Sequence, residues 1–274
     1  MLAHRRQTDS ARLERCLRFE LELDRRAAER IEETDWGAVF LSPSIPLVWD
    51  ANWILVERPG LAAAEIAALA DEAIGGAGMK HRTAFAAGLG EGARLAGEFA
   101  ALGWQVERTV YMVWGGEPSW PEERSRTAAV EAEERPHSRI EPLRRELIRG
   151  GLPIMGVTTD ETVEQLIEWD RRLGEAGGDR WFVAPALKPA SCCRLLVGGG
   201  VGQVEDVGTL AAARERGFAR TVTLAAARAS RADGNELTYL GALADDWPRL
   251  MYERLGFEPA GTVHAFRRRP DTAP

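Results

Sequence analysis

The stretch GQVEDVGTLAAARERGFARTVTLAAARAS, residues 202–230, contains a strand pattern, a basic turn and an alanine-rich helix in direct succession. Arg214, Arg216 and Arg220 surround Gly217 where this helix begins. The first turn of a helix carries unpaired N–H groups and the positive end of the helix dipole, so acidic residues are its usual occupants. Basic residues at this position suggest that a bound anion supplies the negative charge.

The composition limits the class of protein. The 274 residues are 45% hydrophobic and 28% charged, as in soluble globular proteins, and suffice for two modest domains. A net charge of -7 argues against a general nucleic-acid binder. No apolar run reaches the ~18 residues of a membrane span, and no signal-peptide core is present, so we expect a cytoplasmic protein without membrane contact. The cysteines at 16, 192 and 193 form no CxxC pair, which predicts reduced, buried thiols and no metal site.

Hydrophobic periodicity and turn residues predict an alternation of helices and strands. In the first half the expected elements are an amphipathic helix over 10–33, two extended segments within 38–57, helices over 61–74 and 90–102, and strands over 82–87 and 104–114. The charged segment 115–139, which contains three prolines, is the best linker candidate.

The second half repeats the alternation. The expected elements are strands over 154–159, 180–186, 192–197, 202–210, 236–244 and 257–267, and helices over 160–177, 216–229 and 245–255. Thr158 with Glu161 fits a capping box for the helix 160–177, and Asp246 fits an N-cap for the helix that contains Pro248.

Two short segments echo each other. LGWQVERTV (102–110) and LGFEPAGTV (255–263) both place a glycine between a helix and a strand. This echo predicts two related domains in tandem, over 1–118 and 141–270, joined by a linker over 119–140. Tyr252 precedes the second glycine by four residues, where the first half has Phe99, and the first half also has no basic turn. Any chemistry is therefore expected in the second half.

The basic turn and the segment MYERLGF (251–257) together resemble the GNAT superfamily, the acyl-CoA-dependent N-acyltransferases. The signature of that family, Arg/Gln-x-x-Gly-x-Gly/Ala, is matched by Arg214, Gly217 and Ala219, and its later Tyr-x-x-x-Gly-Phe segment by Tyr252, Gly256 and Phe257. The resemblance covers about 150–267 well and is only architectural over 10–115. It implies an α/β fold in which each domain has a mixed, mostly antiparallel twisted sheet flanked by helices.

The resemblance also implies a binding site for acetyl-CoA as cosubstrate. The pantetheine arm would pair with backbone groups of Val207, Gly208 and Thr209, and the phosphates would meet the amides from Glu215 through Arg216, Gly217, Phe218 and Ala219 to Arg220. Glycine in a strand also fits a plain bulge, and the arginines also fit a solvated helix start. Asp245 stands where many relatives carry an asparagine near the pantetheine, so its contact with the cofactor is an open expectation.

Direct attack of an amine on a thioester needs a proton acceptor and a proton donor. Tyr252 matches the donor tyrosine of the family. Glu205 is the first candidate for the base, Asp206 the second and His264 a weaker one. Because successive side chains of a strand alternate between faces, we expect only one of Glu205 and Asp206 to line the substrate side.

Three classes of function remain to be compared. The leading one is an N-acetyltransferase that acts on a small-molecule amine or an amino acid, as a monomer or homodimer. The second is a non-catalytic acyl-CoA-binding or regulatory module. A dinucleotide-binding oxidoreductase is suggested by GGGVGQVEDVG (198–208), but Glu205 stands where the motif needs glycine or alanine, and the run precedes a strand. Some of the nine tryptophans could line an aromatic acceptor pocket between the halves.

Overall fold

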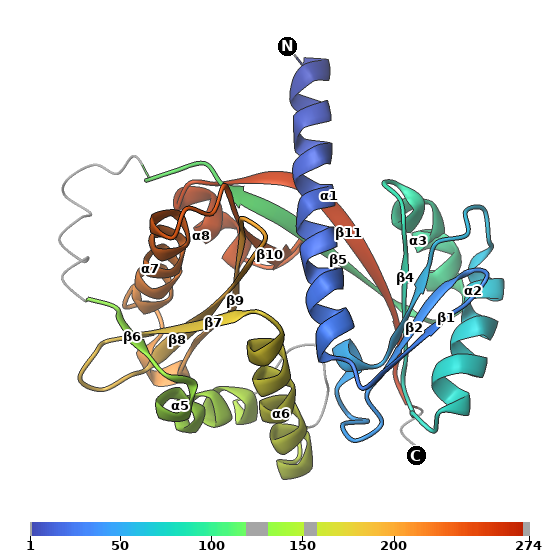
Figure 1. Cartoon of the computed structure of the whole chain (residues 1–274), viewed down its shortest axis with the longest axis horizontal. Coiled ribbons are helices and arrows are strands. Elements are labelled where there is room, and N and C mark those ends of the chain that lie inside the picture. Colours follow the sequence, from blue (N-terminus) through green and yellow to red (C-terminus); the bar gives the residue numbers. More distant parts are fainter. Residues whose placement is uncertain (1, 119–130, 151–157, 271–274) are drawn as a thin grey trace.

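The computed structural model describes residues 2–118, 131–150 and 158–270. Its core is a single sheet of eleven strands in the order β1-β2-β3-β4-β11-β5-β10-β9-β8-β7-β6. Most neighbouring strands are antiparallel, and the parallel pairs are β3 with β4 and β9 with β10. The mixed, mostly antiparallel sheet flanked by helices is the fold class that the sequence predicted, although both halves share one sheet (Figure 1).

The first half supplies one end of this sheet. Its elements are α1 (Leu2–Ala27), β1 (Arg30–Glu33), β2 (Gly37–Leu41), η1 (Trp49–Ala51), β3 (Trp53–Val56), α2 (Ala63–Ala70), the π-helical turn η2 (Asp71–Gly75), β4 (Arg82–Ala86), α3 (Glu91–Ala101) and β5 (Gln105–Trp114). The predicted helix over 10–33 begins and ends too late, because α1 already starts at Leu2 and β1 pairs with β2 from Arg30.

The second half supplies the other end. Its elements are β6 (Glu133–Arg135), α5 (His137–Arg149), α6 (Asp160–Ala176), β7 (Gly178–Ala184), β8 (Ser191–Gly198), β9 (Val201–Thr209), η4 (Ala211–Ala213), α7 (Phe218–Ala232), β10 (Leu237–Leu243), α8 (Pro248–Arg254) and β11 (Phe257–Arg268). The strands and helices predicted over 160–267 are confirmed, whereas β6 and α5 were missed. The strand expected over 154–159 and most of the linker lie outside the described residues.

Two predicted helix caps were wrong by one residue. Thr159, not Thr158, caps α6, and its hydroxyl accepts a hydrogen bond from the Thr162 amide. Trp247, not Asp246, is the N-cap of α8, and the Asp246 carboxylate accepts from the Trp247 amide instead.

The last strand of each half pairs with the other half. β5 pairs with β10 along Val113–Tyr239 to Thr109–Leu243, and β11 pairs with β4 along Phe85–Ala265 to Arg82–Arg268. β5 and β11 also pair with each other over nearly their whole lengths. The consequence is packing across the halves: Phe266 of β11 stacks on Phe99 of α3 with ring centroids 4.0 Å apart.

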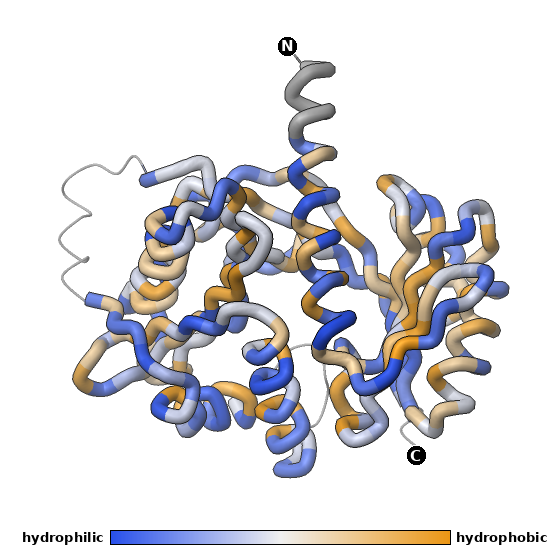
Figure 2. Tube along the Cα trace, in the orientation of Figure 1, coloured by the Kyte–Doolittle hydropathy of each residue, from blue (hydrophilic) through white to orange (hydrophobic). Residues whose placement is uncertain are grey.

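Helices cover both faces of the sheet. On one face lie α1, α5 and α6, and on the other lie α2 and α3 over the first half and α7 and α8 over the second (Figure 1). The buried side of α1 carries Leu13, Cys16, Phe19 and Leu23, at helical spacing, and it packs on β5, β8, β9 and β10. Figure 2 shows the resulting alternation of apolar and polar residues along α1.

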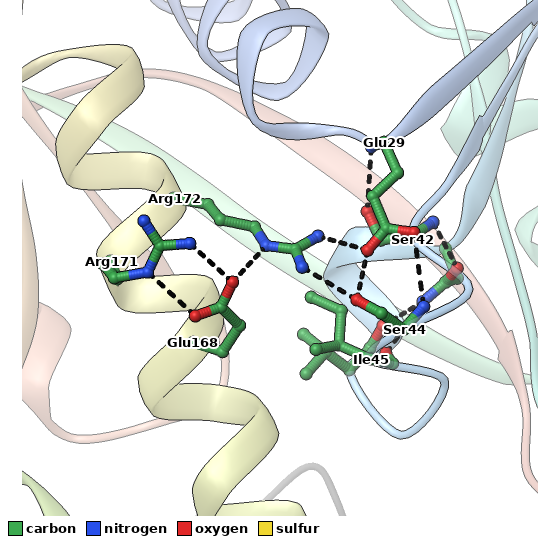
Figure 3. A network of polar contacts seen from close by, with 9 residues as sticks. Glu29, Ser42, Ser44, Ile45, Glu168, Arg171 and Arg172 are labelled. Carbon is green, nitrogen blue, oxygen red and sulfur yellow. Dashed lines mark hydrogen bonds and ion pairs between the residues drawn. The ribbon is translucent and has the colours of Figure 1, made fainter.

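Polar contacts and an apolar cluster join α6 to the first half (Figure 3). Arg172 of α6 donates to Glu29 Oε1 at 2.7 Å and to Ser44 Oγ at 2.8 Å, and Glu168 orients it by accepting from its Nε at 2.8 Å. Beside them an apolar cluster joins Ile45 and neighbouring residues of the first half to α6. These contacts bring α6 and the first half together along one side of the cavity described below.

The two echoed glycines occupy equivalent places. Gly103 follows α3 with φ +75°, and Gly256 follows α8 with φ +87°, so both adopt the left-handed conformation that ends a helix. The echo therefore marks a repeated helix–glycine–strand unit. The surroundings differ: a Cβ on Gly103 would have open space, whereas one on Gly256 would lie 2.4 Å from the carbonyl oxygen of Gly116.

We predict that Gly103→Ala and Gly256→Ala destabilise the protein unequally. Left-handed backbone alone costs an alanine about 1–2 kcal/mol, which is the full expected effect at Gly103. At Gly256 the clash with backbone adds about 1–3 kcal/mol. Denaturant unfolding of the two variants measures the difference, and equal losses of unfolding free energy would contradict the argument.

Candidate active site

A gap opens in the sheet between β9 and β10. Their parallel pairing runs from Val201–Leu237 to Gln203–Tyr239 and stops there, although β9 continues to Thr209 and β10 to Leu243. On its other side β9 stays paired with β8 as far as Ser191–Thr209. The backbone of Val207, Gly208 and Thr209 therefore faces β10 without forming a ladder with it.

A β-bulge in β9 follows the end of this pairing. Between the pairs Arg194–Glu205 and Cys192–Gly208, β9 advances three residues while β8 advances two. Asp206, in the bulge, has φ +53°, a left-handed conformation that is uncommon for a residue with a side chain. Its carboxylate forms an ion pair with Arg144 of α5, and Arg194 Nη1 lies 4.0 Å from its Oδ2.

The bulge corrects one prediction. Regular alternation would send Glu205 and Asp206 to opposite faces, but both line the same cavity on the α1 face, because the extra residue turns Asp206 back. Asp206 is held by arginines, whereas Glu205 accepts a 2.7 Å hydrogen bond from the neutral amide of Gln203. Glu205 is thus the more available of the two as a base.

The packing of α5 against β9 accounts for a glycine at position 208. A Cβ at this position would lie 2.9 Å from Leu147 Cδ1 of α5, so glycine allows this helix to pack against the strand. Its carbonyl oxygen accepts a 2.7 Å hydrogen bond from Ser191 Oγ.

The turn before α7 presents backbone amides without a protein cap. Gly217 is the N-cap in the left-handed conformation, with φ +81°, and Glu215 is left-handed as well. The first turn of α7 contains no acidic residue, and no side chain among the described residues caps it. Arg214 Nε donates to the Thr209 carbonyl at 3.4 Å, and the Arg216 guanidinium lies 5.0 Å from the centre of the Phe218 ring. Phe218 itself is buried, so only its backbone is available to a ligand.

The equivalent place in the first half is closed. The amide of Ala62, at the start of α2, donates to the Glu65 carboxylate at 2.8 Å, and the amide of Ala63 donates to the Glu98 carboxylate at 2.9 Å. Strands β3 and β4 stay paired to Val56–Ala86. Internal carboxylates thus occupy the start of α2, whereas the first turn of α7 contains no acidic residue.

Tyr252 lies on the opposite face of the sheet from Glu205. It is buried in the core formed by α7, α8 and the sheet, with its ring 6.1 Å from that of Phe257. Burial raises the pKa of its hydroxyl, so Tyr252 stays protonated and can donate. The sheet separates these two residues, and the gap between β9 and β10 is an opening in that sheet.

A cavity of about 780 Å³ lies between the two halves on the α1 face. Its walls come from α1, α6, β3 to β5 and β9 to β11, and they include Glu205, His264, Trp49, Trp53 and Trp169. Three of the tryptophans are therefore where the sequence suggested an acceptor pocket, whereas Trp181 is in the core and Trp247 is 65% exposed.

Burial dominates the electrostatics of this cavity. It raises the pKa of Glu205 to about 8, with repulsion from Asp206 and Glu20 adding to the effect. Glu20 of α1 accepts from Tyr111, Tyr239 and Gln203, and burial raises its pKa to about 7. The Gln203 amide contacts both carboxylates and so links them.

Two weaker candidates have other contacts. Both oxygens of Asp245 accept from Arg108 Nη2 of β5 at 2.7 Å, on the exposed surface, and its role toward a cofactor stays a prediction. His264 packs against Gly92, and burial lowers the pKa of its imidazole.

Sequence reasoning missed Glu20, Asp24, Glu107 and Tyr111, all of which line the cavity. Glu20 and Asp24 offered a signal, because they adjoin the apolar side of an amphipathic helix, near Phe19 and Leu23. Glu107 and Tyr111 reach the cavity because β5 pairs with β10 of the second half, and no local sequence pattern encodes this pairing.

Three further findings concern the described residues. All three cysteines are buried and unpaired, as predicted. No group of three histidine, cysteine or acidic side chains in 2–118, 131–150 and 158–270 is arranged to hold a metal ion. Among the helices of the same ranges, none combines the length and apolar character that crossing a membrane requires.

We predict that Arg144→Met destabilises the protein far more than Arg145→Met. The first change leaves Asp170 and Asp206 buried without their main cation, which costs about 3–5 kcal/mol. Arg145, its neighbour, pairs with Glu141 and Glu164 nearer the surface, where such pairs contribute about 0–1 kcal/mol. Chemical denaturation of both variants checks this, and a small loss for Arg144→Met would remove the argument that the arginine holds the bulge.

Comparisons with known proteins agree with this geometry. Residues 190–265 match the family described as FR47-like protein. No curated protein matches the chain. Among solved structures, a GCN5-related N-acetyltransferase from Kribbella flavida is similar with TM-score 0.58 and 18% identity, over 96% of this chain and 94% of that one.

A functionally unknown conserved protein from Staphylococcus epidermidis is similar with TM-score 0.67 and 16% identity, over 89% of this chain and 94% of that one. At these identities the structural likeness establishes the fold. The family match covers β8 to β11, which carry the bulge, the basic turn and Tyr252. The chain therefore has the fold of the GCN5-related N-acetyltransferases, and its residues 190–265 match the FR47-like family.

Proposed function

We propose that the second half transfers an acetyl group from acetyl-CoA to an amine. The observation that carries this proposal is the divergence of β9 from β10 beside the uncapped start of α7. An extended chain with a phosphate group at one end needs both features, a free strand edge and converging amides. The first half offers neither, so one cosubstrate per chain is expected.

The residues of the gap fit the cosubstrate. Backbone groups of Val207, Gly208 and Thr209 would pair with the pantetheine arm as with an added strand. Amides from Glu215 to Arg220 would meet the pyrophosphate, and Gly217 lets the phosphates approach because it has no Cβ. The guanidinium groups of Arg214 and Arg216 would offset phosphate charge.

When bound, acetyl-CoA would supply the thioester carbonyl that the amine attacks. Glu205, on the cavity side, would take a proton from the incoming ammonium group, while Gln203 keeps its carboxylate oriented. Tyr252, on the other side of the gap, would donate its hydroxyl proton to the leaving sulfur. The cavity between the halves would hold the amine and limit the access of water.

Calorimetric titration with acetyl-CoA tests the cosubstrate. We predict binding at one site per chain, and loss of binding in Arg214→Glu, because the change places a negative charge beside the phosphates. The matched control is Arg58→Glu, at the corresponding turn of the first half, where Arg58 pairs with Asp35. That control should bind normally; equal loss in both variants, or no binding by the native protein, would contradict the proposal.

Tyr252→Phe separates an enzyme from a binding module. We predict that this variant binds acetyl-CoA as the native protein does but releases CoA to amines at least ~10²-fold more slowly, the range for a lost general acid. Thiol release with a panel of amines measures the rate. Binding without turnover in the native protein would favour the acyl-CoA-binding module.

The pH profile tests Glu205. Because a base must be unprotonated, and burial raises the pKa of Glu205 to about 8, kcat/KM should rise with pH up to about 8 and then level. In Glu205→Gln the rise of kcat/KM that ends near pH 8 should vanish. The pH dependence that comes from titration of the amine substrate should remain in both proteins. An identical limb in the variant would assign the base to another group, such as His264.

A further inference from the structure

The walls of the cavity carry more acidic groups than the protein pairs with cations. Arg144 compensates Asp170 and Asp206, and Arg267 compensates Asp50 and Glu107. The remaining wall carboxylates form no ion pair with any described residue; they are Glu20, Asp24, Glu57 and Glu205. Arg18 is the one other arginine of the described wall, so acidic groups outnumber cations there, and a bound cation would favour their ionised form.

The acidic groups gather at two ends. Glu20 and Glu205 are linked through Gln203, on the strand that borders the gap. Asp24 is one helical turn from Glu20, with Cβ atoms about 5–6 Å apart. Glu107 lies at the other end of the cavity, because it is four residues along β5 from Tyr111, whose hydroxyl donates to Glu20. Glu107 also shares Arg267 with Asp50. Asp24 lies on α1 between Glu20 and Ala27, and Ala27 packs in the cluster that contains Ala51, the neighbour of Asp50 in η1.

The far end also contains unused hydrogen-bonding capacity. The Glu107 side chain is only 10% exposed, and its Oε2 accepts no hydrogen bond; the nearest cation, Arg267 Nε, is 3.6 Å away. No described residue donates to the Asp24 carboxylate, which lines the same cavity. A buried acceptor without a donor is costly, so these groups fit a ligand that brings N–H donors and positive charge.

Apolar and aromatic groups line the space as well. Leu21, Trp53 and Trp169 are part of the wall and offer apolar surface to an alkyl chain. The rings of the two tryptophans also attract a cation. Acidic groups at two ends of a cavity that also has apolar walls favour a linear ligand with a charge at each end.

We propose, on the basis of the proposed acetyl transfer, that the acceptor is a linear alkyl diamine. Its reacting nitrogen would lie at Glu20 and Glu205, beside the gap, and its second ammonium group at Asp24 and Glu107. The reaction forms the amide bond at one nitrogen, breaks the thioester and leaves CoA thiol. The second nitrogen stays protonated and unmodified.

The test compares matched acceptors. Thiol release is measured with 1,4-diaminobutane, n-butylamine and 4-aminobutan-1-ol, which differ only in the group at the far end. The native protein should prefer the diamine on the order of tenfold or more in kcat/KM, the equivalent of one desolvated ion pair. Asp24→Asn should remove most of this preference, and Glu107→Gln should reduce it, while Glu14→Gln, on the exposed side of the same helix, keeps it.

Calorimetry with 1,4-diaminobutane keeps the two proposals separable. Turnover of all three acceptors at equal kcat/KM would overturn the diamine inference and leave acetyl transfer intact. Diamine binding that Asp24→Asn weakens, without turnover of any amine, would support the cation site and contradict the proposed function. A preference for the diamine that Asp24→Asn leaves intact would overturn the assignment of the second ammonium to Asp24.

Discussion

The ion pairs around Asp206 are the interaction on which the site depends. Arg144 and Arg194, buried on the α1 face, hold a carboxylate whose backbone is left-handed, and this residue is the extra one in β9. The bulge lies just beyond the end of pairing between β9 and β10, and it places Glu205 and Asp206 together in the cavity. Removing these cations would leave both a strained backbone and an unpaired charge. Asp206 therefore supports the geometry of the site without having to take part in the reaction.

Because β5 and β11 each pair with a strand of the other half, residues of both halves line the cavity. Each half ends in a strand that lies beside a strand of the other, so the cavity wall contains Glu107 and Tyr111 from the first half and Glu205 from the second. The first half has closed its own helix start with Glu65 and Glu98, yet it contributes much of this wall. Its part in the proposed function is therefore to shape the acceptor side.

Local patterns predicted much of the fold. The echo around Gly103 and Gly256, the basic turn at Gly217 and most strands followed from periodicity and from the special backbone of glycine. Short elements and cap positions were missed because they depend on tertiary contacts: β6 is an edge strand of three residues, and Thr159 caps α6 one residue later than expected. Asp206 was a candidate base, but its left-handed conformation and the bulge escaped prediction, because arginines 62 and 12 residues away in sequence stabilise them.

The most direct test is amide hydrogen exchange with and without acetyl-CoA. The account predicts slower exchange over 205–220, where β9 borders the gap and α7 begins, and unchanged exchange over 54–66, the matching segment of the first half. Protection of 54–66, or none over 205–220 at saturating acetyl-CoA, would contradict the claim that the second half alone holds the cosubstrate.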